Sequence, residues 1–161
     1  MFEIEETVAI EQPVEAVWSF LMDETNEPLW QTTLAEVRRL THEAMTTGSR
    51  VLEVRRFLGR RIETEWEMTE CEPPRRSSIT SIRAPFAWSG TYALEPIGGG
   101  TQFTARLQGE PAGFFRVAEP VFARIARREL AGNLANLKDV LEAGVGVGLE
   151  VSASPQAAVG A

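Results

Sequence analysis

The sequence predicts an α+β protein in which one antiparallel sheet wraps around a long C-terminal helix. Before Gly113, the chain consists mainly of short segments of strand-like alternation separated by turns, whereas Gly113–Gly144 has the periodicity of one long amphipathic helix. Runs of strands with the helices segregated from them are typical of the α+β class. A chain of 161 residues is long enough to bury about 68–70% of its unfolded surface within one domain.

The first strand is expected over Phe2–Ile10, where apolar and polar residues alternate strictly. Pro13 then opens a short helix, VEAVWSFLMD, because proline suits the first position of a helix and apolar residues recur there at helical spacing. A second short helical turn is expected over Glu27–Trp30. The fold therefore begins with one strand and two short helices.

Six further strands are expected before the long helix. The clearest pair is a hairpin, because the glycine-containing connection LGRR joins two alternating segments. The run Gly98–Gly100 lies between two strands and is interpreted as another hairpin turn, since a phosphate-binding loop would precede a helix and carry a lysine. The six strands are expected over Thr33–Thr41, Arg50–Leu58, Arg61–Cys71, Ser77–Arg83, Phe86–Leu94 and Thr101–Leu107.

The long helix carries one apolar stripe that is interrupted by two polar residues, Glu129 and Asn133. Pro120 cannot donate a backbone hydrogen bond, so the helix either kinks there or starts afresh with Pro120 at its first position. Gly144 is a natural C-terminal stop. At about 100° per residue, the stripe comprises Phe115, Phe122, Ala126, Leu130, Leu137 and Leu141.

Composition excludes several classes of function. With 16 basic and 23 acidic residues, the formal net charge is −7, which argues against a general nucleic-acid or anionic-membrane binder. Cys71 and His42 are each the only residue of their type, so no disulfide framework, histidine triad, transition-metal site or cofactor is expected. The acidic start MFEIEE and the lack of an apolar run of ~18 residues predict a cytoplasmic protein without an integral membrane segment.

Four segments carry the pattern of a known fold family. They are IEQPVEAVWSFLMDETNEPLWQ, TTGSRVLEVRRFLGRRIETEWEMTECEPPRR, YALEPIGGGTQFTARL and the helix ending NLANLKDVLE. Together they resemble the polyketide cyclase/dehydrase-like branch of the SRPBCC superfamily, also called START-like, Bet v 1-like or helix-grip. The resemblance implies a seven-stranded curved antiparallel sheet around the C-terminal helix, with an apolar cavity between them. It also implies roles ranging from lipid and quinone binding to polyketide cyclisation.

The resemblance covers nearly all of the folded chain, and its shared segments mark the fold rather than a catalytic centre. We therefore expect one helix-grip domain over residues 1–143. Residues 144–161 are rich in glycine, alanine and serine and contain no aromatic residue, so a disordered C-terminal tail is expected there.

The aromatic and apolar residues exceed what packing one helix on a sheet requires, and this excess predicts a ligand cavity. Small Ala118 and Ala126 on the helix, opposite bulky strand residues, leave space between the layers. The candidate ligand-binding residues are Arg56, Trp66, Met68, Arg83, Trp88, Tyr92, Phe115, Phe122, Ala126, Glu129, Leu130 and Asn133.

Two arginines among these candidates need a partner. Arg56 shares the strand register of Leu52 and Val54, so its charge is expected to reach a ligand, another side chain or the cavity rim. The charge of Arg83, on the fifth strand, likewise needs a partner. A carboxylate such as Glu129 would neutralise either of them, and this structural ion pair is the favoured interpretation.

Two classes of function remain. The favoured one is binding or carriage of a small hydrophobic or aromatic molecule in the cavity. The alternative is a cyclase- or dehydratase-type enzyme in which Glu129 moves protons while an arginine stabilises an enolate-like oxygen. No catalytic constellation is visible in the sequence, so the enzyme question stays open. The expected partner is a small hydrophobic ligand, and the oligomeric state is left open between monomer and homodimer.

Overall fold

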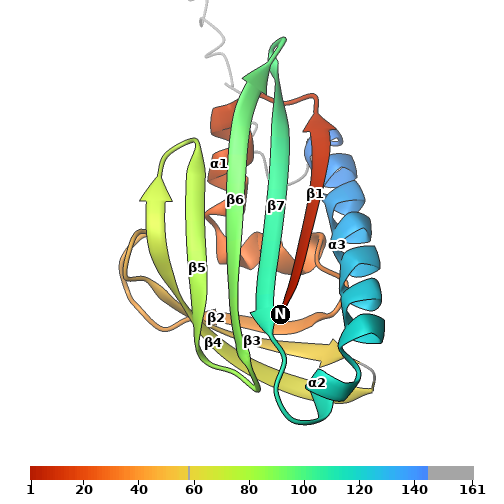
Figure 1. Cartoon of the computed structure of the whole chain (residues 1–161). Coiled ribbons are helices and arrows are strands. Elements are labelled where there is room, and N and C mark those ends of the chain that lie inside the picture. The colour runs from red at the N-terminus through yellow and green to blue at the C-terminus, as the bar shows by residue number, and fades with distance from the viewer. Residues whose placement is uncertain (58, 145–161) are drawn as a thin grey trace, which may run out of the picture.

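The computed structural model describes residues 1–57 and 59–144. Seven strands form one antiparallel sheet in the order β1-β7-β6-β5-β4-β3-β2 (Figure 1). The tail was predicted over residues 144–161, and all of it after Gly144 lies outside the described residues. The elements are β1 (Phe2–Ile10), α1 (Val14–Leu21), the 3-10 helix η1 (Glu24–Leu29), β2 (Leu34–Arg39), β3 (Arg50–Phe57), β4 (Arg60–Glu72), β5 (Arg76–Arg83), β6 (Ala87–Ile97), β7 (Gly100–Glu110), α2 (Phe114–Val117) and α3 (Glu119–Glu142).

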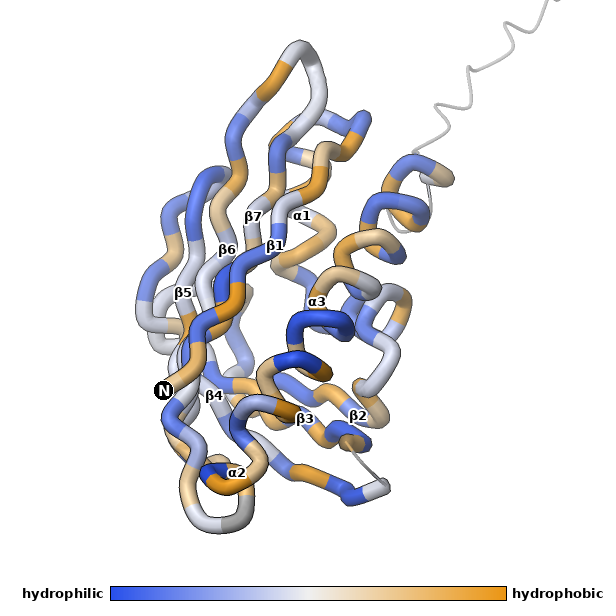
Figure 2. The backbone as a smooth tube through the Cα atoms, turned by 45° about the vertical axis from the view of Figure 1, so that its right-hand side comes forward, coloured by the Kyte–Doolittle hydropathy of each residue, from blue (hydrophilic) through white to orange (hydrophobic). Residues whose placement is uncertain are grey.

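The sheet is strongly curved, and α3 lies on its concave side next to β1 (Figures 1 and 2). Irregular pairing marks the curve, with register shifts between Leu34 and Glu36 in β2 and at two places in β4. Such bulges bend a strand and increase its twist. The predicted helix-grip architecture, with the two short helices after β1, is therefore confirmed.

The C-terminal helical segment is divided at the proline that the sequence singled out. A single turn, α2, precedes α3, and Pro120 stands in the first turn of α3. There its missing N–H costs nothing, because the first turn of a helix has no intrahelical acceptor for that group. Of the two expected alternatives, the fresh start is the correct one. The helix ends at Glu142, and Gly144 follows with a positive φ of 76°.

The solid part of the core lies between α1, the sheet and the C-terminal half of α3. Val17, Phe103, Leu137 and Leu141 are each fully buried there. The N-terminal half of α3 contributes no residue to the fully buried set. Its inward side chains face a cavity instead.

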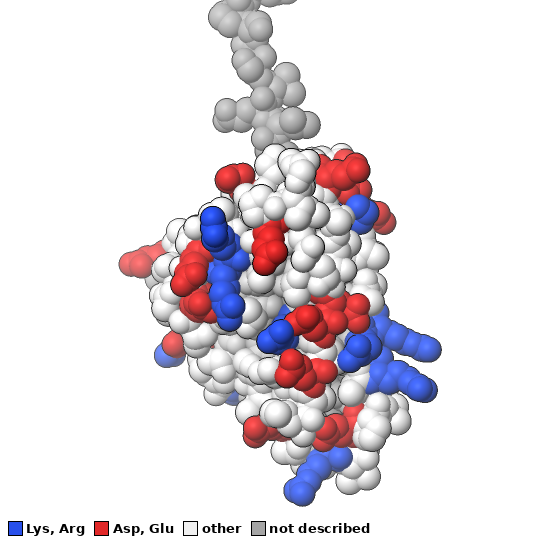
Figure 3. All heavy atoms as spheres, turned by 45° about the horizontal axis from the view of Figure 1, so that its top comes forward, with Lys and Arg blue, Asp and Glu red and all other residues white. Residues whose placement is uncertain are grey.

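The surface carries both signs of charge, and acidic and basic side chains lie side by side over much of the face shown in Figure 3. Several strand-surface arginines take part in ion pairs, such as Arg106 with Glu5 and Arg50 with Glu67. No helix in the described part of the chain is long and apolar enough to cross a membrane.

Candidate functional site

A cavity of about 250 Å3 lies between the concave face of the sheet and the N-terminal half of α3. Its walls are mainly apolar and aromatic, with Trp66 and Met68 from β4, Trp88 from β6 and Leu130 from α3. Gly90 in β6 belongs to the same wall, and the absence of a side chain there leaves room above Ile79. An apolar cavity with a few polar groups is the usual form of a small-molecule site.

Most of the residues that the sequence proposed for a ligand site do line this cavity. The structure brings nine of the twelve together, from two strands and α3. These nine are Trp66, Met68, Trp88, Tyr92, Phe122, Ala126, Glu129, Leu130 and Asn133.

Arg83 and Phe115 do not line the cavity. Arg83 is exposed near the end of β5 and pairs with Glu63 at 2.9 Å and Glu65 at 3.5 Å. Phe115 lies in α2, behind the lining residues, where its ring packs on Phe86 with a centroid distance of 5.4 Å.

The expected inward register of Arg56 is wrong. Arg56 is exposed, and Arg55 is the arginine of β3 that lines the cavity. Both faces of β3 carry a valine that is almost fully buried, Val51 and Val54, so alternation alone did not decide which face points inward. The choice follows from the partners that Arg55 and Glu53 find inside.

One end of the cavity is closed by five phenylalanines from five segments, here called the phenylalanine cluster: Phe2, Phe57, Phe86, Phe115 and Phe122. Phe122, in the first turns of α3, is at its centre. The Phe122 ring centroid lies 5.1 Å from that of Phe57, 5.2 Å from Phe2 and 5.5 Å from Phe86. Edge and tilted contacts of this kind stabilise aromatic pairs beyond simple burial.

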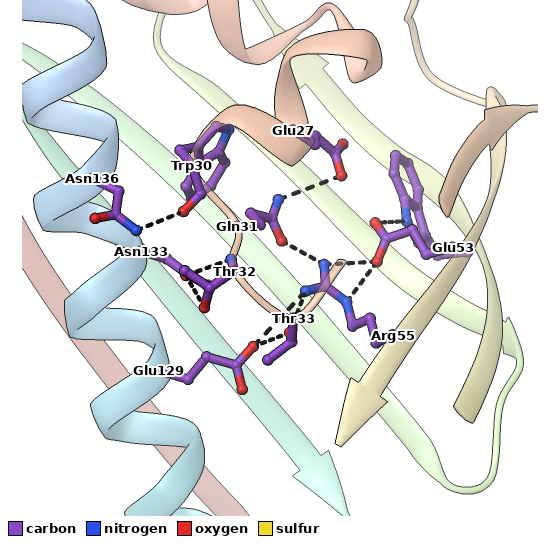
Figure 4. A network of polar contacts seen from close by, with 11 residues as sticks. Glu27, Trp30, Gln31, Thr32, Thr33, Glu53, Arg55, Glu129, Asn133 and Asn136 are labelled. Carbon is purple, nitrogen blue, oxygen red and sulfur yellow. Dashed lines mark hydrogen bonds and ion pairs between the residues drawn. The ribbon is translucent and has the colours of Figure 1, made fainter. Parts of the chain in front are cut away.

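The polar part of the lining is organised around Arg55 (Figure 4). The guanidinium Nε donates to Glu53 Oε2 at 2.8 Å, one Nη donates to the Gln31 side-chain oxygen, and the other Nη lies 3.4 Å from the Thr33 hydroxyl. Glu129, on α3, accepts from the same Thr33 hydroxyl and lies 4.0 Å from the guanidinium. The network thus joins α3, β3 and the loop after η1.

Glu53 is the most deeply buried carboxylate of this network, with 4% of its surface exposed. One of its oxygens accepts from the Trp66 indole at 2.6 Å, and the other accepts from Arg55. Burying a charge is costly unless it is paired and hydrogen-bonded, and both conditions are met here. Glu53 is therefore held in place between Trp66 and Arg55.

Glu27 is a second buried carboxyl group beside this pair. Burial raises its pKa well above the usual value for a glutamate, the neighbouring Glu53 raises it further, and Arg55 opposes the shift only in part. Its side chain accepts one long hydrogen bond of 3.4 Å from Gln31. Two carboxyl groups that share one guanidinium cannot both ionise cheaply, so Glu27 is the group that tends to keep its proton.

Tyr92 lines the same cavity. Its ring packs on Phe103 at 5.1 Å and Trp30 at 6.4 Å, and within the described residues the hydroxyl has no hydrogen-bond partner. The side chain keeps some accessible surface although it lies deep in the fold, because that surface belongs to the cavity. Burial raises the pKa of Tyr92, and Glu27 and Glu53 add to the shift. The hydroxyl is thus a neutral donor that remains available.

Asn133 lines the cavity and also holds the loop after η1 against α3. Its side-chain oxygen accepts from the backbone N–H of Thr32 at 3.1 Å, and Asn136, one turn along, donates to the Trp30 carbonyl at 3.3 Å (Figure 4). These bonds attach the loop after η1 to α3. The loop carries Gln31 and Thr33, so the two asparagines position the partners of Arg55.

Sequence reasoning missed the polar residues in and around the Arg55 network, namely Glu27, Gln31, Thr33, Glu53 and Arg55, and also Thr64, Ser77 and Arg106 of the cavity lining. Only one sequence signal pointed to any of them, namely that Val51, Glu53, Arg55 and Phe57 form an alternative register of β3 with two charged members. Within the described residues, no group of three or more His, Cys, Asp or Glu side chains is arranged to hold a metal ion.

The fold and this cavity place the protein among the helix-grip proteins. The chain matches the family described as "Polyketide cyclase / dehydrase and lipid transport" over residues 1–142, and it belongs to that family. Among proteins with curated descriptions, none matches the chain significantly.

Solved structures with the same fold include TTHA0849 from Thermus thermophilus, with a TM-score of 0.79, 18% identity, and coverage of 89% of this chain and 99% of that one. DR_A0006 from Deinococcus radiodurans has a TM-score of 0.68 and 23% identity, covering 90% and 100% of the two chains. The di-domain ARO/CYC BexL from the BE-7585A biosynthetic pathway has a TM-score of 0.71 and 18% identity over 88% of this chain and 47% of that one. At these identities the similarity shows the fold.

Proposed function

We propose that this protein binds a small hydrophobic or aromatic molecule in the cavity between the sheet and α3. The observation that carries the proposal is an apolar, aromatic-walled space of about 250 Å3 with polar groups on one side. An engineered apolar cavity of about 150 Å3 in another protein binds benzene, so the space here suits a molecule of about two fused rings. The polar groups would orient that molecule.

Filling the cavity from the helix side tests the proposal. Ala126 lines the cavity on α3, and Ala126→Trp would place an indole where the ligand is expected. We expect this variant to lose uptake of an uncharged fluorescent probe such as N-phenyl-1-naphthylamine. Its fold should remain intact, because existing space can accept the ring at an overpacking cost of about 1–3 kcal/mol.

Ala135→Trp is the matched control. Ala135 is exposed and lies nine residues along the same helix, hence on its opposite face. The control should take up the probe like the wild type. The proposal fails if the wild type takes up no probe, or if Ala126→Trp binds it as well as Ala135→Trp does. Unfolding of Ala126→Trp would mean that the interior is solid, which also contradicts the proposal.

A second candidate function is proton transfer to a bound carbonyl compound, as in a cyclase or dehydratase. Two buried carboxyl groups, Glu27 and Glu53, line the cavity together with Tyr92, and burial and the neighbouring Glu53 raise the pKa of Glu27 well above the usual value for a glutamate. A carboxyl group of this kind can act as a general acid. The family that the chain belongs to is described as including polyketide cyclases and dehydrases, which supports this candidate.

The sequence assigned the proton-moving role to Glu129, whereas Glu129 accepts from Thr33 and lies beside Arg55. Glu27 is now the better candidate. If the protein transfers protons, it should accelerate deuterium exchange at the α-carbon of a bound aryl ketone in D2O, measured by mass spectrometry. Glu27→Gln should abolish the acceleration. Ketone binding without any accelerated exchange would support the binding function alone.

A further inference from the structure

The polar side of the cavity contains one arginine, Arg55, and its charge is already satisfied by the protein. Each nitrogen of the Arg55 guanidinium has an acceptor on another side chain: Glu53 for Nε, Gln31 and Glu53 for one Nη, and Thr33 for the other. Glu129 is a further carboxylate at 4.0 Å. A ligand carboxylate would have to displace one of these partners, and a displaced buried carboxylate would lose its pairing.

Acidic groups outnumber basic ones around this polar region. Glu27, Glu53 and Glu129 line the cavity together with the single guanidinium of Arg55. Arg106 also borders the cavity, but its guanidinium is on the exposed face of β7, where it pairs with Glu5 and Glu3. An anionic head group would therefore lie beside carboxyl groups that already compensate Arg55 and would meet, among the described lining residues, no available cation.

Tyr92 supplies a hydrogen-bond donor for an uncharged head group. Tyr92 lines the cavity and its hydroxyl has no hydrogen-bond partner among the described residues, so it can donate to a ligand oxygen. Burial, Glu27 and Glu53 raise the pKa of Tyr92, so its hydroxyl keeps the proton that it donates. The aromatic walls accept the rest of the molecule.

On the basis of the proposed binding function, we infer that the cavity selects uncharged aromatic ketones or phenols, whose oxygen accepts a hydrogen bond from Tyr92, and rejects the corresponding carboxylates. This assigns Tyr92 as the residue that determines the head group, and it assigns Arg55 to the architecture of the site.

Three compounds with the same bicyclic body test this inference: naphthalene, 2-acetonaphthone and 2-naphthoate at neutral pH. Their dissociation constants are measured by isothermal titration calorimetry. The ketone should bind about fivefold more tightly than naphthalene, the gain from one hydrogen bond of about 1 kcal/mol. The naphthoate should bind at least tenfold more weakly than the ketone. In Tyr92→Phe, the ratio of ketone to naphthalene affinity should fall to about one.

A spectroscopic measurement reports the contact directly. Tyr92 is the only tyrosine in the sequence, so labelling tyrosine with 13C at the ring carbon that bears the hydroxyl gives one NMR signal. The signal should respond to 2-acetonaphthone more strongly than to naphthalene, because only the ketone accepts a hydrogen bond. The unfolding midpoint of Tyr92→Phe shows whether that variant is folded when its affinities are compared.

Glu129→Gln tests the electrostatic half of the inference. It removes one negative charge beside Arg55 while keeping an amide oxygen that can accept from Thr33. The affinity for 2-naphthoate should rise severalfold relative to that for the ketone. Equal rises for both compounds would overturn the charge argument.

The failure of this inference is distinguishable from failure of the proposed function. Tight binding of 2-naphthoate, or a ketone preference that survives in Tyr92→Phe, overturns the head-group assignment while ligand binding itself stands. If neither the three compounds nor the uncharged probe binds, both the inference and the proposed binding function are wrong.

Discussion

The two halves of α3 face different surroundings although they belong to one helix. In the C-terminal half, Leu134, Leu137 and Leu141 are at most 2% exposed and pack in the solid core with α1. In the N-terminal half, Phe122, Ala126 and Leu130 line the cavity. The same apolar stripe thus forms a core at one end and a cavity wall at the other.

The difference comes from what lies opposite the helix. At the C-terminal half, the side chains of α1 fill the concavity of the sheet, with Val17 and Phe20 fully or almost fully buried. At the N-terminal half, beyond the phenylalanine cluster, the space between the helix and the sheet is the cavity. There, η1 and β3 bring the polar groups around Arg55 to the edge of the space. A cavity in this fold is therefore the part of the concave face that α1 does not fill.

The largest expected effect compares two leucines of α3. Leu137→Ala removes a fully buried side chain from the solid core, and we expect it to lower the free energy of unfolding by about 3–5 kcal/mol, as for other core truncations. Leu130→Ala only enlarges an existing space, so about 1–2 kcal/mol is expected, below the usual range because the site already borders a void. Urea denaturation measures both values.

Ligand binding should change more in Leu130→Ala than in Leu137→Ala, the reverse of the order expected for stability. Leu130→Ala should admit a larger aromatic probe, such as a three-ring compound, whereas Leu137→Ala should leave the ligand preference of the wild type. If the two truncations cost the same free energy, the two halves of α3 are equally well packed and the comparison fails.

The next effect concerns two glutamates of η1 that are three residues apart. Glu24 is paired with Arg39, which donates to both of its oxygens, while Glu27 shares Arg55 with Glu53. Glu27→Gln should raise the free energy of unfolding by about 1–2 kcal/mol at neutral pH, within the normal range for single substitutions. Glu24→Gln should lower it, because the substitution weakens a partly buried ion pair.

The pH dependence of this pair has a definite sign. The folded-state pKa of Glu27 is raised by burial and by Glu53, so its contribution is most favourable below the ordinary glutamate pKa of about 4.3. That contribution is lost as the pH rises through the raised pKa, because the unfolded chain then binds fewer protons than the folded one. The advantage of Glu27→Gln over the wild type should therefore grow with pH. An advantage that is constant from pH 4 to pH 8 would contradict the shift.

The smallest expected effect is at the phenylalanine cluster. The other end of the concave face is solid, so the cluster is where we expect a ligand to pass. Phe122→Leu should cost about 1 kcal/mol through weakened ring contacts and should speed uptake of an uncharged probe in stopped-flow fluorescence. Phe103→Leu is the control, because Phe103 is fully buried away from the cluster and packs on Tyr92. It should be less stable without faster uptake, and faster uptake in both variants would place the passage elsewhere.

Much of the architecture was determined by local features of the sequence. Alternation over Phe2–Ile10 and in the later strands, proline at the start of α1 and α3, and Gly144 at the end of α3 predicted the elements within a few residues of their observed bounds. These signals work because strand alternation, proline geometry and helix termination depend on neighbours close in sequence. The same patterns placed nine of the twelve proposed residues around one cavity.

Only the tertiary structure decided the polar side of the site. A period of two separates the faces of β3 but does not say which face turns inward, and both faces carry a buried valine. The inward face is the one on which Glu53 and Arg55 find Trp66, Gln31, Thr33 and Glu129. Glu129 and Thr33 are 96 positions apart in the sequence. Buried charges are stable only where such distant partners converge, and that convergence exists only in the folded chain.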